Sequence, residues 1–251
     1  IVGNVKITRR ITLGCTHPLH TQRGGLKPRR SDARQLQTRA DMHACAKTDL
    51  KGKSVAIFGC GPIGLFSVLI ARAWGASCII AVDPNTEKTS LALSLGADCA
   101  FSPNNNSPKT KAWEKDPELI SQILAQTAGQ GVDVAMEMAG YNSSLNNALA
   151  CARRGGQVIL FGLKSGDFTI QEFDRVVVRR GLTLHAVIGR YIFNTWYMTK
   201  GLLEDKTNKI QEKIWNLLLK QGQGTIVDFA AYQPKQFEAQ LLAQPKIIIK
   251  F

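Results

Sequence analysis

Short apolar runs alternate with helical patterns over most of this chain. From residue 54 onward, runs rich in Val, Ile and Ala have the length of strands buried on both faces. They predict strands at 54–58, 78–82, 97–101, 132–137, 157–161 and 182–188. Helices are predicted between them at 65–74, 86–95, 117–124 and 143–154, with Gly or Pro near their ends. This alternation predicts an α/β fold with a doubly wound parallel sheet, whose carboxyl edge binds ligands.

The first predicted strand runs directly into a glycine turn with the pattern G-x-G-x-x-G. Gly59 permits the tight turn, Gly61 lets backbone approach a pyrophosphate, and Gly64 lets the helix pack closely on the strand. Pro62 suits a first helical turn, where its missing N–H has no partner to lose. The second strand ends at Asp83, 24 residues after Gly59. Methyltransferases carry similar turns, but the strand, helix and acid in this order favour dinucleotide binding.

The net charge of +13 is concentrated at the start of the chain. Residues 1–40 carry nine basic residues and one acidic residue, so they account for +8 of the total. They also lack apolar periodicity, which predicts a disordered basic tail that does not pack on a domain. Nucleic acid remains an alternative partner for this tail, but it has no aromatic residue to stack on bases and no recognisable module.

Candidate metal ligands form one loose cluster, Cys15, His17 and His20. The cluster lacks a C-x-x-C partner and a fourth ligand nearby, so no metal site is predicted. The other cysteines stand singly in apolar runs or turns, as free thiols of a reducing compartment do: Cys45, Cys60, Cys78, Cys99 and Cys151. This distribution predicts a cytoplasmic protein. The long uncharged run 54–71 is accounted for by a strand and a helix, so no membrane segment is predicted.

Several motifs together resemble the cofactor-binding half of the medium-chain, zinc-dependent alcohol dehydrogenases, over about residues 41–251. They are Gly59 to Gly64 with Asp83 and Lys88, Leu95-Gly96-Ala97-Asp98, Gly131-Val132-Asp133-Val134, Phe161-Gly162-Leu163, and Gly189-Arg190 with Phe193-Asn194-Thr195-Trp196. The last element is most like that of the L-threonine 3-dehydrogenases. The resemblance implies a Rossmann domain at 41–200. It also implies that 201–251, with a helix near 211–219 and a strand at 246–250, packs on a catalytic domain.

The resemblance implies NAD as the cofactor and places its contacts residue by residue. The family's NAD contacts correspond to Ile63, Asp83, Lys88, the turn Phe161-Gly162-Leu163 and the strand end Val187-Ile188, beside the glycine turn itself. Gly189 lies at the same strand end, and Arg190 is a candidate for pairing with a substrate carboxylate or lying near nicotinamide. Glu137, Asp133 and His185 are interpreted as structural residues.

This sequence departs from the family in one large respect. Family members begin with a catalytic β-domain that supplies the zinc ligands, and residues 1–40 do not resemble it, which suggests a fragment, a frameshift or a truncation. Three hypotheses follow: part of an NAD- and zinc-dependent secondary-alcohol dehydrogenase, a non-catalytic NAD-binding remnant, or a basic-armed nucleic-acid or regulatory protein. A small alcohol is expected as substrate only where a catalytic domain is supplied. The apolar surface left without that domain predicts a partner or a homo-oligomer.

Overall fold

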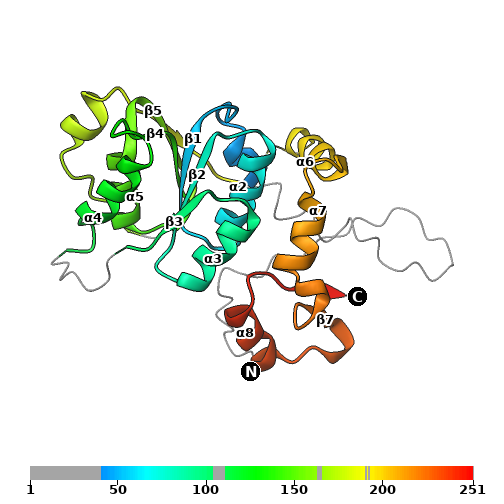
Figure 1. Ribbon diagram of the computed structural model, residues 1–251. Helices are drawn as coiled ribbons and strands as arrows, with labels where there is room; N and C mark the ends of the chain where they lie inside the picture. The colour runs from blue at the N-terminus through cyan, green and yellow to red at the C-terminus, as the bar shows by residue number, and fades with distance from the viewer. Residues whose placement is uncertain (1–40, 104–110, 163–165, 190, 192, 251) are drawn as a thin grey trace.

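The computed structural model describes residues 41–103, 111–162, 166–189, 191 and 193–250 (Figure 1). Its centre is a parallel six-stranded sheet with the order β3-β2-β1-β4-β5-β6. The strands are β1 (Ser54–Phe58), β2 (Cys78–Val82), β3 (Cys99–Phe101), β4 (Val132–Glu137), β5 (Ala152–Leu160) and β6 (Thr183–Ala186). The strand order reverses between β1 and β4, and a ligand-binding crevice is expected at such a switch point. The predicted doubly wound sheet is confirmed.

Helices cover both faces of this sheet (Figure 1). They are α2 (Pro62–Ala73), α3 (Thr86–Leu95), α4 (Pro117–Ala125) and α5 (Asn142–Cys151). Successive strand residues point to opposite faces, so Ile57 packs in one apolar core with Leu69 of α2, and Phe58 packs in the other with Leu149 of α5. Burial of both faces explains why β1 and β2 are almost wholly apolar in sequence.

The boundary between α5 and β5 differs from the prediction of a helix to residue 154. The helix ends at Cys151, and Ala152 already pairs with Val132 across a register shift before the regular pairing of Val134 with Gln157. Arg180 donates hydrogen bonds to the carbonyl oxygens of Ala150, at 3.0 Å, and Ala152. These tertiary contacts satisfy the last carbonyl groups of the helix before the Gly155-Gly156 pair is reached, so the local glycine signal does not decide the boundary.

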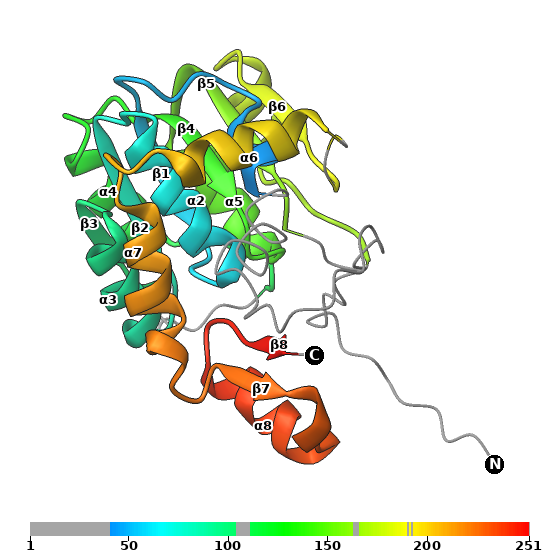
Figure 2. The ribbon, with the colours of Figure 1, turned by 90° about the vertical axis from the view of Figure 1, so that its right-hand side faces the viewer.

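The C-terminal part packs partly on the sheet domain and partly by itself. It contains α6 (Asn194–Glu204), α7 (Ile210–Lys213), η2 (Ile214–Leu218), η3 (Lys220–Gly222), β7 (Ile226–Asp228), η4 (Phe229–Ala231), α8 (Pro234–Ala243) and β8 (Ile248–Lys250). Leu203, Ile210 and Ile214 join the core beneath α2 and α3. β7 and β8 pair in parallel as a separate two-stranded sheet beside α8 (Figure 2). The predicted helix and last strand are present, but β7 was not predicted.

Among the described helices, none combines the length and apolar character that crossing a bilayer requires. A π-helical turn, η1 (Asp174–Val178), lies between β5 and β6 and was not predicted either.

Asp133 joins three neighbouring strands through its side chain. Its carboxylate accepts hydrogen bonds from the backbone N and the hydroxyl of Ser54 on β1, both at 2.8 Å, and pairs with Arg153 on β5 at 2.6 Å. Burial pushes the pKa of Asp133 upward, but the hydrogen bonds from Ser54 and the contact with Arg153 outweigh burial, so this pKa is lowered. The interpretation of Asp133 as a structural carboxylate fits these contacts.

Asp133→Asn is expected to lower the free energy of unfolding at neutral pH by about 1–2 kcal/mol, because the charge-assisted contacts are lost. The lowered pKa means that the stabilisation by Asp133 is present above its ordinary pKa of 3.8 and is lost as the pH falls through the lowered value. Urea unfolding of the unmodified chain and of Asp133→Asn, at pH 7 and near pH 3, measures this loss of stabilisation. If the difference in free energy of unfolding between the unmodified chain and Asp133→Asn stayed constant with pH, the stabilising role of the charged Asp133 would be contradicted.

Candidate cofactor-binding site

The strand ends form one continuous edge, because neighbouring strands are in register there. Phe58 is paired with Val82 and with Glu137, Glu137 with Leu160, and Leu160 with Ala186. The residues that follow continue the ladder: Gly59 N donates to Val82 O at 2.7 Å, and Val187 N donates to Leu160 O at 2.9 Å. The predicted contacts at the ends of β1, β2, β5 and β6 therefore lie along the carboxyl edge of one sheet.

The three glycines of the turn differ in what surrounds them. Gly59 has a φ of +101°, and a Cβ there would lie 2.9 Å from Ala139. A Cβ on Gly64 would lie 1.8 Å from the carbonyl oxygen of Gly59. Gly61 has an ordinary extended conformation, and a Cβ there would meet nothing within 4 Å. Packing therefore demands glycine at 59 and 64, whereas at 61 the described structure leaves open space.

The N-terminus of α2 follows Gly61 and carries no side-chain cap. Two other helices of the sheet domain differ: Asn85 accepts hydrogen bonds at the start of α3, Asp116 does so at the start of α4, and each helix has a Glu in its first turn, whereas α5 resembles α2 in having neither. α2 has no cap hydrogen bond, no acid in its first turn, and Pro62 at its start. The N–H groups of Ile63 and Gly64, which have no helical acceptor, together with the helix dipole suit an anionic group such as a phosphate.

Asp83 fixes this turn as well as marking the end of β2. Its side chain is 6% exposed. One carboxylate oxygen accepts from Cys60 N at 2.8 Å, and the other accepts from Asn85 N at 2.9 Å. The sequence predicted Asp83 only as a ribose ligand, so its support of the turn was missed. A carboxylate oxygen has a second lone pair, and these contacts therefore leave acceptor capacity for a hydroxyl.

Lys88 is half-buried on α3, near the same turn. Burial is the main cause that raises the pKa of the Cys60 thiol to about 12; the negative charge of Asp83 adds to it, and the positive charge of Lys88 opposes it. Both charges therefore act on the glycine turn. At neutral pH Cys60 is a protonated, buried thiol and not a nucleophile.

Glu137, at the end of β4, organises the turn that follows. It is 3% exposed, and its Oε1 accepts from Ala139 N at 3.0 Å and from Gly140 N at 2.9 Å. Burial raises the pKa of Glu137 although these bonds lower it. Gly162 N donates to Glu137 O at 2.9 Å, and a Cβ on Gly162 would lie 2.1 Å from Gly140 N. Gly162 is thus needed where the β4 and β5 ends approach each other.

The end of β6 contains one contact that the sequence did not indicate. Val187 is buried, Ile188 is 76% exposed, and Gly189 has a φ of +63°. His43 Nδ1 lies 3.2 Å from Gly189 O, and the His43 ring packs on the ring of Tyr191 with centroids 4.4 Å apart. Because 146 residues separate His43 from Gly189, no local pattern could have paired them.

Other predicted positions are buried, are hydrogen-bonded within the sheet, or lie outside the described residues. Phe161 is buried. His185 Nε2 lies 2.8 Å from Gln157 Oε1, as a structural histidine would. Leu163, Arg190 and the residues 1–40, with Cys15, His17 and His20, are not described. Within the described ranges no three His, Cys, Asp or Glu side chains are grouped as metal ligands. The described residues therefore do not fit the zinc site that the family implies.

Comparisons with known proteins agree with this arrangement. A family model described as zinc-binding dehydrogenase matches residues 62–204. The L-threonine 3-dehydrogenase of Bacillus subtilis (strain 168) is 34% identical over 162 residues, which cover 64% of this chain and 43% of that protein. The chain thus spans less than half the length of this relative.

Solved structures share the fold at low sequence identity. An alcohol dehydrogenase from Thermotoga maritima has a TM-score of 0.68 at 21% identity, over 85% of this chain and 54% of that chain. A short-chain alcohol dehydrogenase from E. coli CFT073, solved with NADH, has a TM-score of 0.58 at 18% identity, over 76% of this chain and 49% of that chain. The predicted resemblance is confirmed, and the chain belongs to the zinc-binding dehydrogenase family.

Proposed function

We propose that this chain binds NAD along the carboxyl edge of its six-stranded sheet. The observation that carries the proposal is the uncapped start of α2 beside Gly61, where a phosphate has free N–H donors and room to approach. The pyrophosphate lies on the N–H groups of Ile63 and Gly64. The adenosine ribose lies at Asp83, whose carboxylate accepts from its hydroxyls, with Lys88 alongside.

The nicotinamide half extends from the switch point toward the ends of β5 and β6. Phe161, Gly162, Val187, Ile188 and Gly189 line this path, and Leu163 and Arg190 continue it in sequence. The exposed Ile188 offers apolar surface at the open end of the path. Bound NAD supplies the hydride acceptor, and the residues of this chain hold and orient it.

The whole-protein reaction that we propose is oxidation of a secondary alcohol of the L-threonine type. Support comes from the family match and from the relative that is named L-threonine 3-dehydrogenase. The described residues supply cofactor binding and contain no group suited to zinc, so no step of the alcohol chemistry is assigned to them. A small alcohol is therefore a partner only together with a catalytic domain.

Cofactor titration tests the proposal. We expect the chain to bind NAD more tightly than NADP, because Asp83 repels a 2′-phosphate. At about 4 Å and an effective dielectric near 20, this repulsion is about 4 kcal/mol before solvent and Lys88 reduce it. Asp83→Asn keeps an acceptor for Cys60 N, loses the acceptor of Asn85 N and removes the charge. It should reduce the preference for NAD by about tenfold or more, as calorimetric titration of both cofactors would show.

A matched control is Asp205→Asn, which removes one negative charge from an exposed loop, where the Asp205 carboxylate accepts from Thr207 N and Thr207 Oγ1. Its preference for NAD should equal that of the unmodified chain. Equal affinity of the unmodified chain for NAD and NADP would remove the role given to Asp83. No measurable binding of either cofactor would overturn the proposed function.

A further inference from the structure

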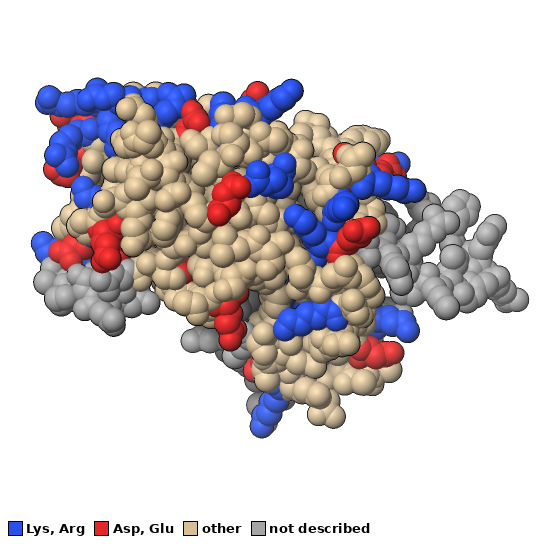
Figure 3. Space-filling model, in the orientation of Figure 1, with Lys and Arg blue, Asp and Glu red and all other residues tan. Residues whose placement is uncertain are grey.

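A cavity of about 720 Å³ lies between the first turn of α4, the end of α5 and η1. Among the described residues that line it, none is acidic. Five are cationic, namely Lys115, Arg153, Arg154, Arg175 and Arg180. Lys and Arg side chains gather at the corner of the molecule that contains η1 and the start of β5 (Figure 3). The positive charge of this protein is therefore not confined to residues 1–40.

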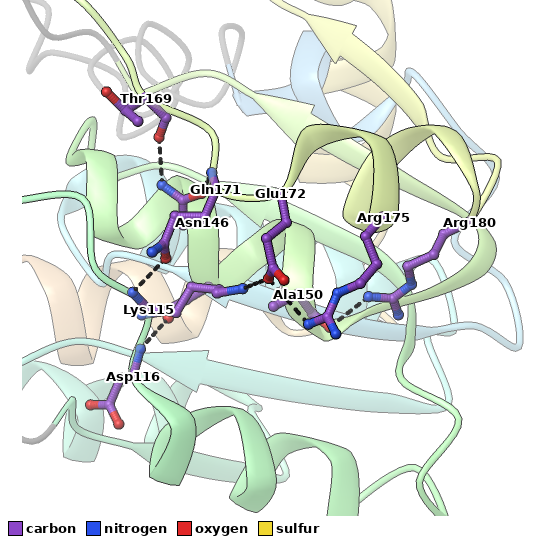
Figure 4. A network of polar contacts seen from close by, with 10 residues as sticks. Lys115, Asp116, Asn146, Ala150, Thr169, Gln171, Glu172, Arg175 and Arg180 are labelled. Carbon is purple, nitrogen blue, oxygen red and sulfur yellow. Dashed lines mark hydrogen bonds and ion pairs between the residues drawn. The ribbon is translucent and has the colours of Figure 1, made fainter.

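The carboxylates near this cavity neutralise only part of its charge. Glu172 is shared by two cations: its Oε2 lies 2.8 Å from Lys115 Nζ and 3.1 Å from Arg175 Nη2 (Figure 4). Arg180 donates to the carbonyl oxygens of Ala150 and Ala152 at the end of α5. Its side chain is thereby held in place by neutral acceptors.

Two further arginines follow at the start of β5. Arg153 pairs with Asp133 at 2.6 Å, while Arg154 has no ion pair within the described part of the chain. Burial is the main cause that lowers the pKa of Arg180, and the positive charges of Arg154 and Arg175 lower it further. Arg180 is half-buried, whereas Arg154 and Arg175 are exposed and lie close enough to act on it. Like charges held close together cost free energy that a bound anion would offset.

We propose that this cavity binds a small anion with two or more phosphate groups. Guanidinium groups match phosphate oxygens with paired hydrogen bonds, and four of the five cations are arginines. The volume lies in the range of small-molecule sites. Within the described part of the lining no aromatic ring offers a surface on which a nucleic-acid base could stack, so recognition rests on the phosphates.

The cavity is separate from the cofactor edge. None of the described residues predicted to contact NAD lines it. Gly129 and Gln130, which do line it, precede β4 and lie toward the amino end of the sheet, whereas the NAD contacts follow the carboxyl ends. A ligand here would therefore not displace NAD.

Calorimetric titration of the full chain with tripolyphosphate at low salt tests this site. We expect saturable one-to-one binding that is retained in the presence of excess NAD. Arg154→Gln and Arg175→Gln should each weaken it roughly tenfold, because each removes a charge-assisted contact. Arg179→Gln is the matched control: Arg179 pairs with Asp174 at 2.6 Å, lies next to Arg180 in sequence and does not line the cavity, so affinity should be unchanged.

Three results would overturn the proposal. The first is absence of saturable binding. The second is equal weakening by Arg179→Gln, which would indicate a diffuse positive field. The third is tighter binding of a short DNA duplex that depends on Arg154 and Arg175, which would assign the surface to nucleic acid instead. Thermal unfolding of each variant verifies folding; Arg154→Gln in particular should fold normally, because its side chain has no ion pair among the described residues.

Discussion

Gly64→Ala is expected to lower the free energy of unfolding by about 3 kcal/mol or more, or to prevent folding altogether. An added Cβ would lie 1.8 Å from Gly59 O and 2.9 Å from Gly59 C. Both are backbone atoms of the preceding turn, so no flexible side chain can move aside. The helix α2 would have to shift away from β1, where Leu65 and Leu69 are fully packed.

Gly61→Ala is the matched control, because it adds the same methyl group three residues earlier in the same turn. Nothing lies within 4 Å of the added Cβ, and the extended conformation of Gly61 suits any residue. The free energy of unfolding should change by less than about 0.5 kcal/mol, while NAD affinity should fall by about tenfold because the methyl group occupies the path of the pyrophosphate. Urea unfolding and NAD titration measure the two effects. Equal stability losses in both variants would contradict the different roles assigned to these glycines.

Elements decided by local patterning could be predicted from the sequence. β1, β2, β4 and α3 have the bounds that the apolar runs and end signals indicated, and the alternation of strands and helices predicted a parallel sheet, although not its strand order. The glycine turn was predictable because the atoms that leave no room for a Cβ at Gly64 belong to the same six-residue motif. The short strands β7 and β8 pair over a gap of about twenty residues, and of the two only β8 was predicted.

Features built by distant residues could not be predicted. The end of α5 depends on Arg180, about thirty residues later, and the His43 contact with Gly189 spans 146 residues. The basic cavity combines cations from the segment before α4, from β5, and from η1 and the turn after it, and in the sequence each of them is an ordinary charged residue. Asp83 was predicted at the right place, but its hydrogen bond to Cys60 N required the geometry of the folded turn.

Glu137→Ala is expected to lower the free energy of unfolding by about 2–4 kcal/mol, because buried donors would lose their acceptor. Oε1 accepts from both Ala139 N and Gly140 N, and the carboxylate also has hydrogen bonds with Tyr141 N and the Ser144 side chain. Alanine offers no acceptor, and Glu137 is 3% exposed, so water does not readily replace the carboxylate. Thermal and urea unfolding would measure the loss.

Glu137→Gln separates the hydrogen bonds from the charge. The amide oxygen can replace Oε1 toward Ala139 N and Gly140 N, so the loss should be smaller than with alanine. The sign of the pH effect follows from burial, which raises the folded-state pKa of Glu137 above its ordinary value of 4.5. The neutral acid is favoured in the fold, so its stabilisation is fully present below pH 4.5 and is lost as the pH rises through the raised pKa. The stability of the unmodified chain relative to Glu137→Gln should therefore decrease as the pH rises from 4 toward 7. An increase over this interval would show that the carboxylate is held in its charged form, and that its hydrogen bonds outweigh its burial.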